Sequence, residues 1–267
     1  MAAITAKNLY KVFGKHAKRG VESLKNGSTR EELREQGLTA AVIDASFEVE
    51  PGEIFVVMGL SGSGKSTLIR MLNGLWDATS GEIFIGDQNL AAMSEEELRT
   101  VRRDRISMVF QSFALLPHRT VGENAAYGLE IKGVSKQERE AKAEEALAMV
   151  GLEGWADSMP DELSGGMQQR VGLARALTAD TDILLMDEAF SALDPLIRKD
   201  MQDQLIDLQA SLNKTIVFIT HDLNEAMRIG DHIAMMRDGR VEQIGTAEEI
   251  LQNPANNYVA DFVKDVD

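Results

Sequence analysis

The spacing of apolar residues along the chain predicts alternating strands and helices. Residues 4–13 and 42–49 alternate loosely between apolar and polar side chains, as expected of strands in an N-terminal β-layer. Shorter runs that are almost entirely apolar predict buried strands at residues 54–58, 106–110, 183–186, 215–220 and 233–236. Helical stretches separate the runs that begin at 106, 183 and 215, and this alternation predicts a mainly parallel sheet with helices on its faces.

Capping signals place the helices. Ser135 is followed three residues later by Glu138, which predicts a helix over residues 135–150. This helix belongs to an expected helical block over about residues 112–178. Further signals predict a helix over residues 65–75, a short helix within 15–38, a tight hairpin at 237–240 and a capped helix that starts at Thr246.

Composition is that of an ordinary globular protein. The 267 residues are 27% charged and 44% hydrophobic, and their formal net charge is −15. Such an acidic balance disfavours non-specific nucleic-acid binding and reads first as a solvated surface. The apolar stretches are too short for a membrane span, the sequence opens with no export leader, and it contains no cysteine. We therefore expect a soluble cytoplasmic protein that binds no nucleic acid.

A glycine-rich loop follows the apolar run at 54–58. Gly59, Gly64, Lys65 and Ser66 match the pattern G-x-x-x-x-G-K-[ST]. Glycines let backbone N–H groups turn towards phosphate oxygens, and the following helix adds its partial positive charge. Lys65 would reach the β- and γ-phosphates, the Ser66 hydroxyl would bind Mg²⁺, and Thr67 would lie near the α-phosphate. The predicted nucleotide contacts are Gly59, Ser61, Gly62, Ser63, Gly64, Lys65, Ser66 and Thr67.

Polar residues end three of the predicted strands. Asp187 and Glu188 follow the run at 183–186, Gln111 follows the run at 106–110, and His221 follows the run at 215–220. Ligand sites in parallel sheets lie at the carboxyl ends of the strands, although acids there can also form a solvated turn. Asp187 would hold Mg²⁺, and Glu188 would polarise the attacking water. Gln111 would meet Mg²⁺ or that water, while His221 would contact the γ-phosphate or orient the base.

A second glycine-rich turn precedes the acidic strand. Ser164 opens a helix whose first turn contains Gly165 and Gly166 and no acid. Its hydroxyl and the free N–H groups of both glycines form an anion site, although alone this would read as a helix cap. A second phosphate site has no use inside one subunit, so the turn indicates a protein that works as a pair.

These motifs, in this order, resemble the ATP-binding subunits of ABC transporters over nearly the whole chain. The Walker A loop is residues 59–67, the Gln-loop residue is Gln111, and the signature is residues 163–167. The Walker B strand ends at Asp187 before Glu188, the D-loop is Ser191-Ala192-Leu193-Asp194, and the switch histidine is His221. The usual signature is Leu-Ser-Gly-Gly-Gln. This chain has Met167 at the fifth position and keeps the serine and both glycines.

The resemblance implies an α/β fold of the P-loop NTPase type. Its ABC ATPase core has a mainly parallel sheet, an N-terminal antiparallel β-layer and an inserted helical subdomain. A RecA-like core would comprise about residues 1–111 and 179–267, and the helical subdomain about 112–178. The chain would be a single ABC ATP-binding domain.

The resemblance also implies how ATP and Mg²⁺ are used. Two ATP molecules would be held between two subunits in a head-to-tail homodimer or pseudo-dimer, against Ser164, Gly165 and Gly166 of the opposite subunit, with Asp194 beside them. An aromatic near the N-terminus would lie against adenine; Phe13 fits first and Tyr10 second. Ser66, Gln111 and Asp187 would be the Mg²⁺ ligands, and Glu188, His221, Gln111 and Lys65 the catalytic group.

An additional helical segment at about 15–38 points within the family to the glycine betaine/proline betaine uptake group. That group imports quaternary ammonium osmolytes and relatives such as choline or trimethylamine N-oxide. The implied partners are transmembrane permease subunits and, indirectly, a substrate-binding protein, with the chain on the cytoplasmic face of the cell membrane. The alternatives are import of another small polar solute, such as an amino acid, or a soluble ABC ATPase outside transport.

Many members of that group carry paired CBS domains after the nucleotide-binding domain. The sequence ends at Asp267, about where these would begin. We expect no CBS domains in this sequence. It would be either a naturally short member of the group or a truncated one. After Gln111, the apolar Phe113, Leu115 and Leu116 mark either ordinary subdomain core or the region that receives a coupling helix from the membrane subunit.

Overall fold

The computed structural model describes residues 1–191 and 193–264, so Ala192 of the expected D-loop and the terminal Asp267 lie outside the described residues. The chain divides into two compact units. The first comprises residues 1–98 and 217–267, and the second comprises residues 99–216. Two elements carry the chain from one unit to the other, namely α4 (Glu95–Asp104) and β8 (Thr215–Thr220).

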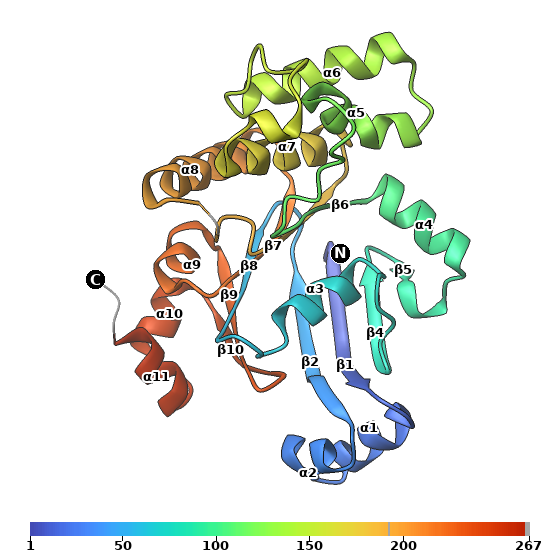
Figure 1. The fold of residues 1–267 in the computed structure, drawn as a ribbon. Coiled ribbons are helices and arrows are strands. Elements are labelled where there is room, and N and C mark those ends of the chain that lie inside the picture. Colours follow the sequence, from blue (N-terminus) through green and yellow to red (C-terminus); the bar gives the residue numbers. More distant parts are fainter. Residues whose placement is uncertain (192, 265–267) are drawn as a thin grey trace. The chain divides into compact units, whose positions relative to one another are not determined.

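The first unit contains an antiparallel sheet and a group of strands around the phosphate loop (Figure 1). The antiparallel sheet has the strand order β2-β1-β4-β5, while β3 pairs in parallel with β9, which pairs antiparallel with β10. The elements of the first unit are β1 (Ile4–Phe13), α1 (Ala17–Lys25), α2 (Arg30–Glu35), β2 (Thr39–Val49), β3 (Ile54–Met58), α3 (Lys65–Leu72), β4 (Ser80–Ile85), β5 (Gln88–Asn89), η1 (Leu90–Ala92), α9 (Leu223–Ile229), β9 (His232–Arg237), β10 (Arg240–Gly245), α10 (Ala247–Gln252) and α11 (Asn257–Val263).

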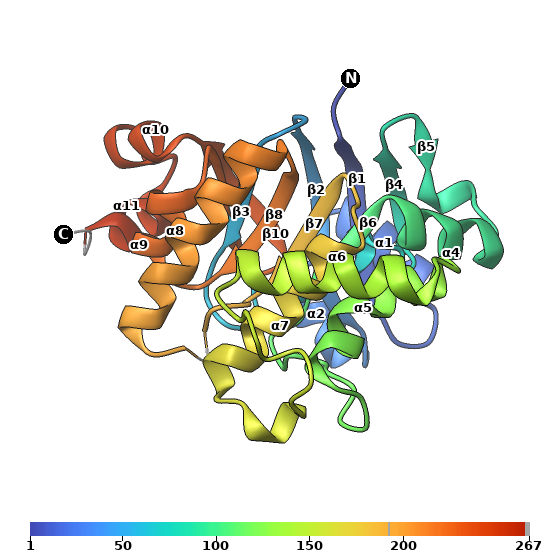
Figure 2. The ribbon, with the colours of Figure 1, turned by 90° about the horizontal axis from the view of Figure 1, so that it is seen from above.

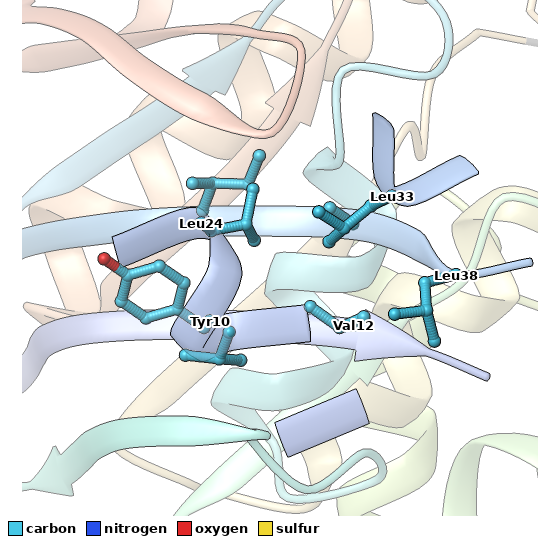
Figure 3. Close-up of a cluster of buried hydrophobic side chains, with 8 residues drawn as sticks. Tyr10, Val12, Leu24, Leu33 and Leu38 are labelled. Carbon is cyan, nitrogen blue, oxygen red and sulfur yellow. The ribbon is translucent and has the colours of Figure 1, made fainter. Parts of the chain in front are cut away.

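The expected insertion forms two helices with a core of their own. Helix α1 packs on β1 and α2 packs on β2, at one end of these strands (Figure 1). Figure 3 shows the apolar side chains that fill the space between them. This insertion cluster consists of Tyr10, Val12, Val21, Leu24, Leu33, Leu38, Ala40 and Ile43. The insertion is therefore part of the first unit's packed core, because β1 and β2 themselves contribute half of the cluster.

The second unit packs helices together and pairs two strands. Helices α5, α6 and α7 contact one another (Figure 2), and β6 pairs in parallel with β7. Its elements are β6 (Ile106–Val109), α5 (Val121–Ile131), α6 (Lys136–Met149), η2 (Pro160–Glu162), α7 (Gly165–Thr178), β7 (Ile183–Asp187) and α8 (Pro195–Leu212). The boundary of the helical block at about 112–178 stays a prediction, because this unit also includes the strands on either side.

Most predicted elements are present, with differences at their ends. The strands at 54–58 and 215–220 have the predicted bounds, while β6 stops at Val109, one residue early. Helix α3 ends at Leu72 because Asn73 and Gly74 leave the helix, the glycine with a φ of 65°. The insertion holds two helices where one was predicted, because Gly27 breaks the stretch with a φ of 95°.

The insertion cluster makes a measurable contribution to stability. Leu33 is fully buried in it, so Leu33→Ala should lower the free energy of unfolding by about 2–5 kcal/mol through lost burial and a cavity. The matched control is Glu35→Ala on the same helix, which is exposed and should change stability by less than about 0.5 kcal/mol. Urea unfolding compares the two variants. Equal effects would show that the cluster contributes nothing.

Candidate functional site

The phosphate loop, residues 59–67, is shaped by two glycines that no other residue can replace. Gly59 has a φ of 153° and Gly64 a φ of 105°. A Cβ on Gly59 would lie 2.2 Å from the carbonyl oxygen of Met236, and one on Gly64 would lie 2.2 Å from that of Ala41. Backbone from β2 and from β9 therefore presses directly on the loop, and only glycine leaves room for it.

Lys65 is the buried charge of this loop. It is the first residue of α3, its side chain is 4% exposed, and Nζ donates to the carbonyl oxygens of Gly59 at 2.8 Å and Leu60 at 3.1 Å. The ammonium is thus folded against the backbone of the loop, beside the N-terminus of α3. A helix start and a buried cation together favour an anionic ligand.

The other predicted loop contacts differ in exposure. Ser61 and Gly62 are exposed, and Ser66 and Thr67 are half-buried. Ser63 is buried, its N–H donates to the carbonyl oxygen of Leu60 at 3.1 Å, and its Oγ has no hydrogen-bond partner among the described residues. The backbone of the loop is therefore a closed turn whose outer rim faces solvent.

The structure separates the two aromatic candidates for an adenine contact. Phe13 ends β1 and is 36% exposed, whereas Tyr10 is 6% exposed within the insertion cluster. The Phe13 ring meets Trp76 edge-on, with 5.2 Å between the ring centroids, and Lys11 Nζ lies 5.1 Å from its centroid. Only Phe13 offers a ring face without unpacking the core. Trp76, which supports it, was missed by the sequence analysis.

His221 in the first unit is exposed at the end of β8, as its position after that strand predicts. Its neighbour Asp222 caps α9, because the carboxylate accepts the N–H of Glu225 at 3.1 Å. The Thr220 hydroxyl, on the other side, accepts the Asp222 N–H at 3.0 Å. The histidine therefore lies in a turn whose flanking residues are fixed by hydrogen bonds.

In the second unit, Gln111 and Glu188 lie together. They follow the parallel strands β6 and β7, in which Val109 pairs with Met186. Gln111 Nε2 donates to Glu188 Oε2 at 3.4 Å. Asp187, the last residue of β7, is 3% exposed. The ends of two paired strands therefore bring a carboxylate and an amide together.

Glu188 has an unusual backbone. Its φ is 47°, in the left-handed region that non-glycine residues rarely adopt. Its carbonyl oxygen accepts both the N–H of Ser191 at 3.1 Å and the Ser191 hydroxyl at 2.8 Å. Such a conformation costs free energy and persists where the surroundings enforce it, which is common at functional sites.

The signature turn and the D-loop line one groove of about 520 Å³, which we call the signature groove. Ser164 caps α7 by accepting the N–H of Met167 at 3.3 Å, and Asp194 caps α8 by accepting the N–H of Ile197 at 3.1 Å. Two helix starts therefore open into the same groove. Its lining is Gly151, Leu152, Trp155, Ser164, Gly165, Gly166, Met167, Arg170, Leu193, Asp194 and Ile197.

The segment after Gln111 is held by two residues that the sequence analysis missed. Arg175 of α7 donates to the carbonyl oxygens of Ala114 at 2.7 Å and Phe113 at 3.2 Å, and burial lowers the pKa of its guanidinium. Asn124 of α5 is fully buried and accepts the N–H of Leu116 at 2.8 Å. A buried polar residue on a helix gives no sequence pattern that reveals its partner.

The fold and these motifs define a P-loop nucleoside triphosphatase. The sequence model of a family described as ABC transporter matches residues 42–191. The chain belongs to the ABC transporter family.

Named relatives agree with this family. The chain is 63% identical to the glycine betaine transport ATP-binding protein of Bacillus subtilis (strain 168), over 99% of this chain and 63% of that protein. It is 59% identical to the glycine betaine/carnitine transport ATP-binding protein of Listeria monocytogenes (strain 10403S), over 100% of this chain and 68% of that one. The chain thus spans about two thirds of the length of these relatives: slightly less than two thirds of the Bacillus protein and slightly more of the Listeria protein.

A solved structure confirms the fold class. It is the dimeric structure of a post-hydrolysis state of an ATP-binding cassette bound to ADP and Pi, 33% identical to this chain. The match has a TM-score of 0.78 and covers 91% of this chain and 98% of the solved one. The predicted α/β fold of the ABC ATPase type is therefore confirmed.

The close backbone approach at Gly64 can be tested against Gly62, which also has positive φ but has no atom within 4 Å of a Cβ built on it. Gly62→Ala should cost about 1–2 kcal/mol of unfolding free energy from its backbone conformation alone. Gly64→Ala has a conformational cost at least as large, because its φ of 105° lies further from the left-handed region, and it adds an overlap with backbone, so it should cost at least about 2 kcal/mol more. Urea unfolding without nucleotide measures both. A similar cost for the two would refute the packing argument.

Proposed function

We propose that the chain is the ATP-hydrolysing motor subunit of an ABC importer that takes up a quaternary ammonium or related osmolyte through a separate permease. Family membership and the similarity to the betaine and carnitine transport proteins support this proposal. Candidate cargoes are glycine betaine, proline betaine, choline and trimethylamine N-oxide. The observation that carries the hydrolytic part is the contact between Gln111 and Glu188.

The phosphate loop is proposed as the site of the ATP phosphates. Lys65 is already buried at the loop, so it would supply the counter-charge without first losing its hydration. Ser61 and Gly62 on the rim, with Ser66 and Thr67 at the start of α3, would face the β-, γ- and α-phosphates. The exposed ring of Phe13, supported edge-on by Trp76, would lie against adenine.

The residues proposed for Mg²⁺ have the oxygen donors that this ion prefers. They are the Ser66 hydroxyl, the Gln111 amide oxygen and the Asp187 carboxylate, and Asp187 is almost fully buried at the end of β7. Among the described residues, no group of three or more His, Cys, Asp or Glu forms a metal cage. Mg²⁺ is usually held by one or two side chains together with substrate phosphates. When bound, the ion would neutralise charge on the β- and γ-phosphates.

Glu188 is proposed as the residue that activates water. Its carboxylate lies at hydrogen-bond distance from the Gln111 amide, so the two side chains form a polar pair that would hold a water between the base and the phosphate. The left-handed backbone of Glu188 sets the direction of its Cα–Cβ bond, and the contact with Gln111 orients its carboxylate. His221 would contact the γ-phosphate or orient this base.

A pair of subunits is proposed as the working unit. The signature groove presents two helix starts, with Ser164, Gly165, Gly166 and Asp194 on its wall. Helix starts attract anions, so the groove would receive the γ-phosphate of ATP held by the opposite subunit. The solved relative bound to ADP and Pi is dimeric, which supports this arrangement.

The remaining partners are proposed from the transport relatives. They are transmembrane permease subunits and, indirectly, a substrate-binding protein, and the chain would work at the cytoplasmic face of the membrane through that permease. None of the helices in the described part of the chain has the length and apolar character of a membrane span. Phe113, Leu115 and Leu116 are half-buried, so they can both support the subdomain and meet a permease helix.

Substitution of Glu188 tests the hydrolytic assignment. Glu188→Gln keeps the shape and the contact with Gln111 but removes the base, so it should bind ATP with wild-type affinity and lower kcat by at least about 100-fold. Glu153→Gln, an exposed glutamate in the same unit, should leave kcat unchanged. Phosphate release and equilibrium binding of MgATP measure both quantities. Wild-type turnover by Glu188→Gln would remove Glu188 from the mechanism.

Mixed subunits test the shared site. Ser164→Arg fills the signature groove, and Lys65→Ala removes the counter-charge of the phosphate loop, so each variant alone should be inactive. A mixed pair retains one site in which both halves are intact, and it should recover part of the wild-type ATPase rate. Titrating one variant into the other at constant total protein measures the recovery. No recovery although mixed pairs form would contradict a site built from two subunits.

A further inference from the structure

The insertion reaches the phosphate loop through one side chain. Arg30 is the first residue of α2, whose start is fixed by a capping box between Thr29 and Glu32. Leu33, one turn further on, anchors the helix in the insertion cluster. The cap and the buried Leu33 therefore fix the position of the Arg30 backbone.

The guanidinium of Arg30 bridges two other elements of the first unit. Nη2 donates to the carbonyl oxygen of Gly62 at 3.2 Å, and Nη1 donates to Asp238 Oδ1 at 3.2 Å. Gly62 lies in the phosphate loop, and Asp238 lies in the turn between β9 and β10. Arginine suits this bridge because its rigid planar fork holds two donors in fixed, separate directions, whereas the donors of lysine all lie on one nitrogen.

The same turn also holds the next peptide of the loop. The N–H of Gly239 donates to the carbonyl oxygen of Ser63 at 2.9 Å, and the carbonyl of Gly239 accepts the N–H of Ile43 at 2.7 Å. Two consecutive carbonyls of the loop, those of Gly62 and Ser63, are therefore bonded from outside. The β9–β10 turn is itself hydrogen-bonded to β2 through Gly239 and Ile43.

These hydrogen bonds restrain a part of the loop that packing does not hold. Gly62 has a φ of 78°, and a Cβ built on it would meet nothing within 4 Å, so packing does not fix this residue. The peptide between Gly62 and Ser63 is instead fixed by hydrogen bonds at both ends, its C=O to Arg30 and its N–H to the carbonyl of Leu60. Hydrogen bonds to a carbonyl also polarise the N–H of the same peptide, which strengthens it as a donor.

We propose that Arg30 is a positioning residue that holds the phosphate loop in its nucleotide-binding shape by joining Gly62 to Asp238. It acts on ATP through the loop and touches no substrate. The inference rests on the proposed role of the phosphate loop and adds to it a function for the insertion. Because a preformed loop loses less freedom on binding, the bridge should raise nucleotide affinity and have little effect on the chemical step.

Nucleotide binding by the complete 267-residue chain tests the proposal. Arg30→Met keeps the apolar inner part of the side chain and removes its donors, and it should weaken MgADP binding and raise the KM for ATP about three- to tenfold, with kcat within about twofold of wild type. Arg30→Lys should recover only part of this loss. Arg34→Met, an exposed arginine on the same helix, is the matched control and should leave the Kd and KM unchanged.

The partner in the turn gives a second, independent measurement. Asp238 has a φ of 48°, which asparagine tolerates as well as aspartate does, so Asp238→Asn removes the charge without disturbing the turn. It should weaken MgADP binding in the wild-type background and have a clearly smaller effect in Arg30→Met, where only the contact of Asp238 Oδ2 with Arg237 Nε, 3.4 Å away, is left to weaken. Urea unfolding midpoints equal to wild type would establish that the insertion stays folded in each variant.

The outcomes separate this inference from the function on which it rests. If Lys65→Ala loses MgADP binding while Arg30→Met binds as wild type, the bridge has no role and the loop assignment stands. If Lys65→Ala also binds as wild type, the loop assignment itself fails. A loss in Arg30→Met that appears only in kcat, or effects of Arg30→Met and Asp238→Asn that simply add, would also overturn the proposal.

Discussion

The first unit depends on the close approach of two backbone carbonyls to the phosphate loop. The carbonyl oxygens of Met236 and Ala41 occupy the space where Gly59 and Gly64 would carry a Cβ. These carbonyls belong to β9 and β2, so the positions of both strands determine the path of the loop. The loop is thus a part of the core that turns towards a ligand, and its shape follows from packing well before any nucleotide binds.

In the second unit, the polar side chains of the candidate site are positioned by backbone conformation and by helix capping. Glu188 is held in a left-handed conformation by its bonds to Ser191, and Ser164 and Asp194 each cap the helix that they open. Arg175 and Asn124 fix the segment after Gln111. The residues proposed for binding and hydrolysis therefore lie at the ends of strands and helices, where backbone groups remain for ligands or caps.

The sequence predicted the elements with local signals and missed those without them. Apolar runs located β3 and β8 with their bounds, and the pattern of residues 59–67 located the loop. The strand β4 was missed because its apolar run, residues 83–85, is short and does not alternate. The support that Trp76 gives to Phe13 was missed because an aromatic pair has no fixed spacing in the sequence. The Arg30 contacts were equally hidden, since 208 residues separate Arg30 from Asp238. Folding brings such partners together, and only the three-dimensional structure reveals them.

The placement of two aromatics on β1 has a consequence for how this chain can change in evolution. Tyr10 is packed beneath the insertion and Phe13 is exposed at the end of the same strand, three positions later. Any gain or loss of one residue between them would move the exposed ring out of place while the insertion still held the strand. Between the two rings, Val12 is buried in the insertion cluster and Lys11 is half-buried, so a change at Lys11 should be tolerated better than a change in the length of the stretch. The position of the insertion cluster on β1 therefore determines how far along the strand the exposed ring of Phe13 lies.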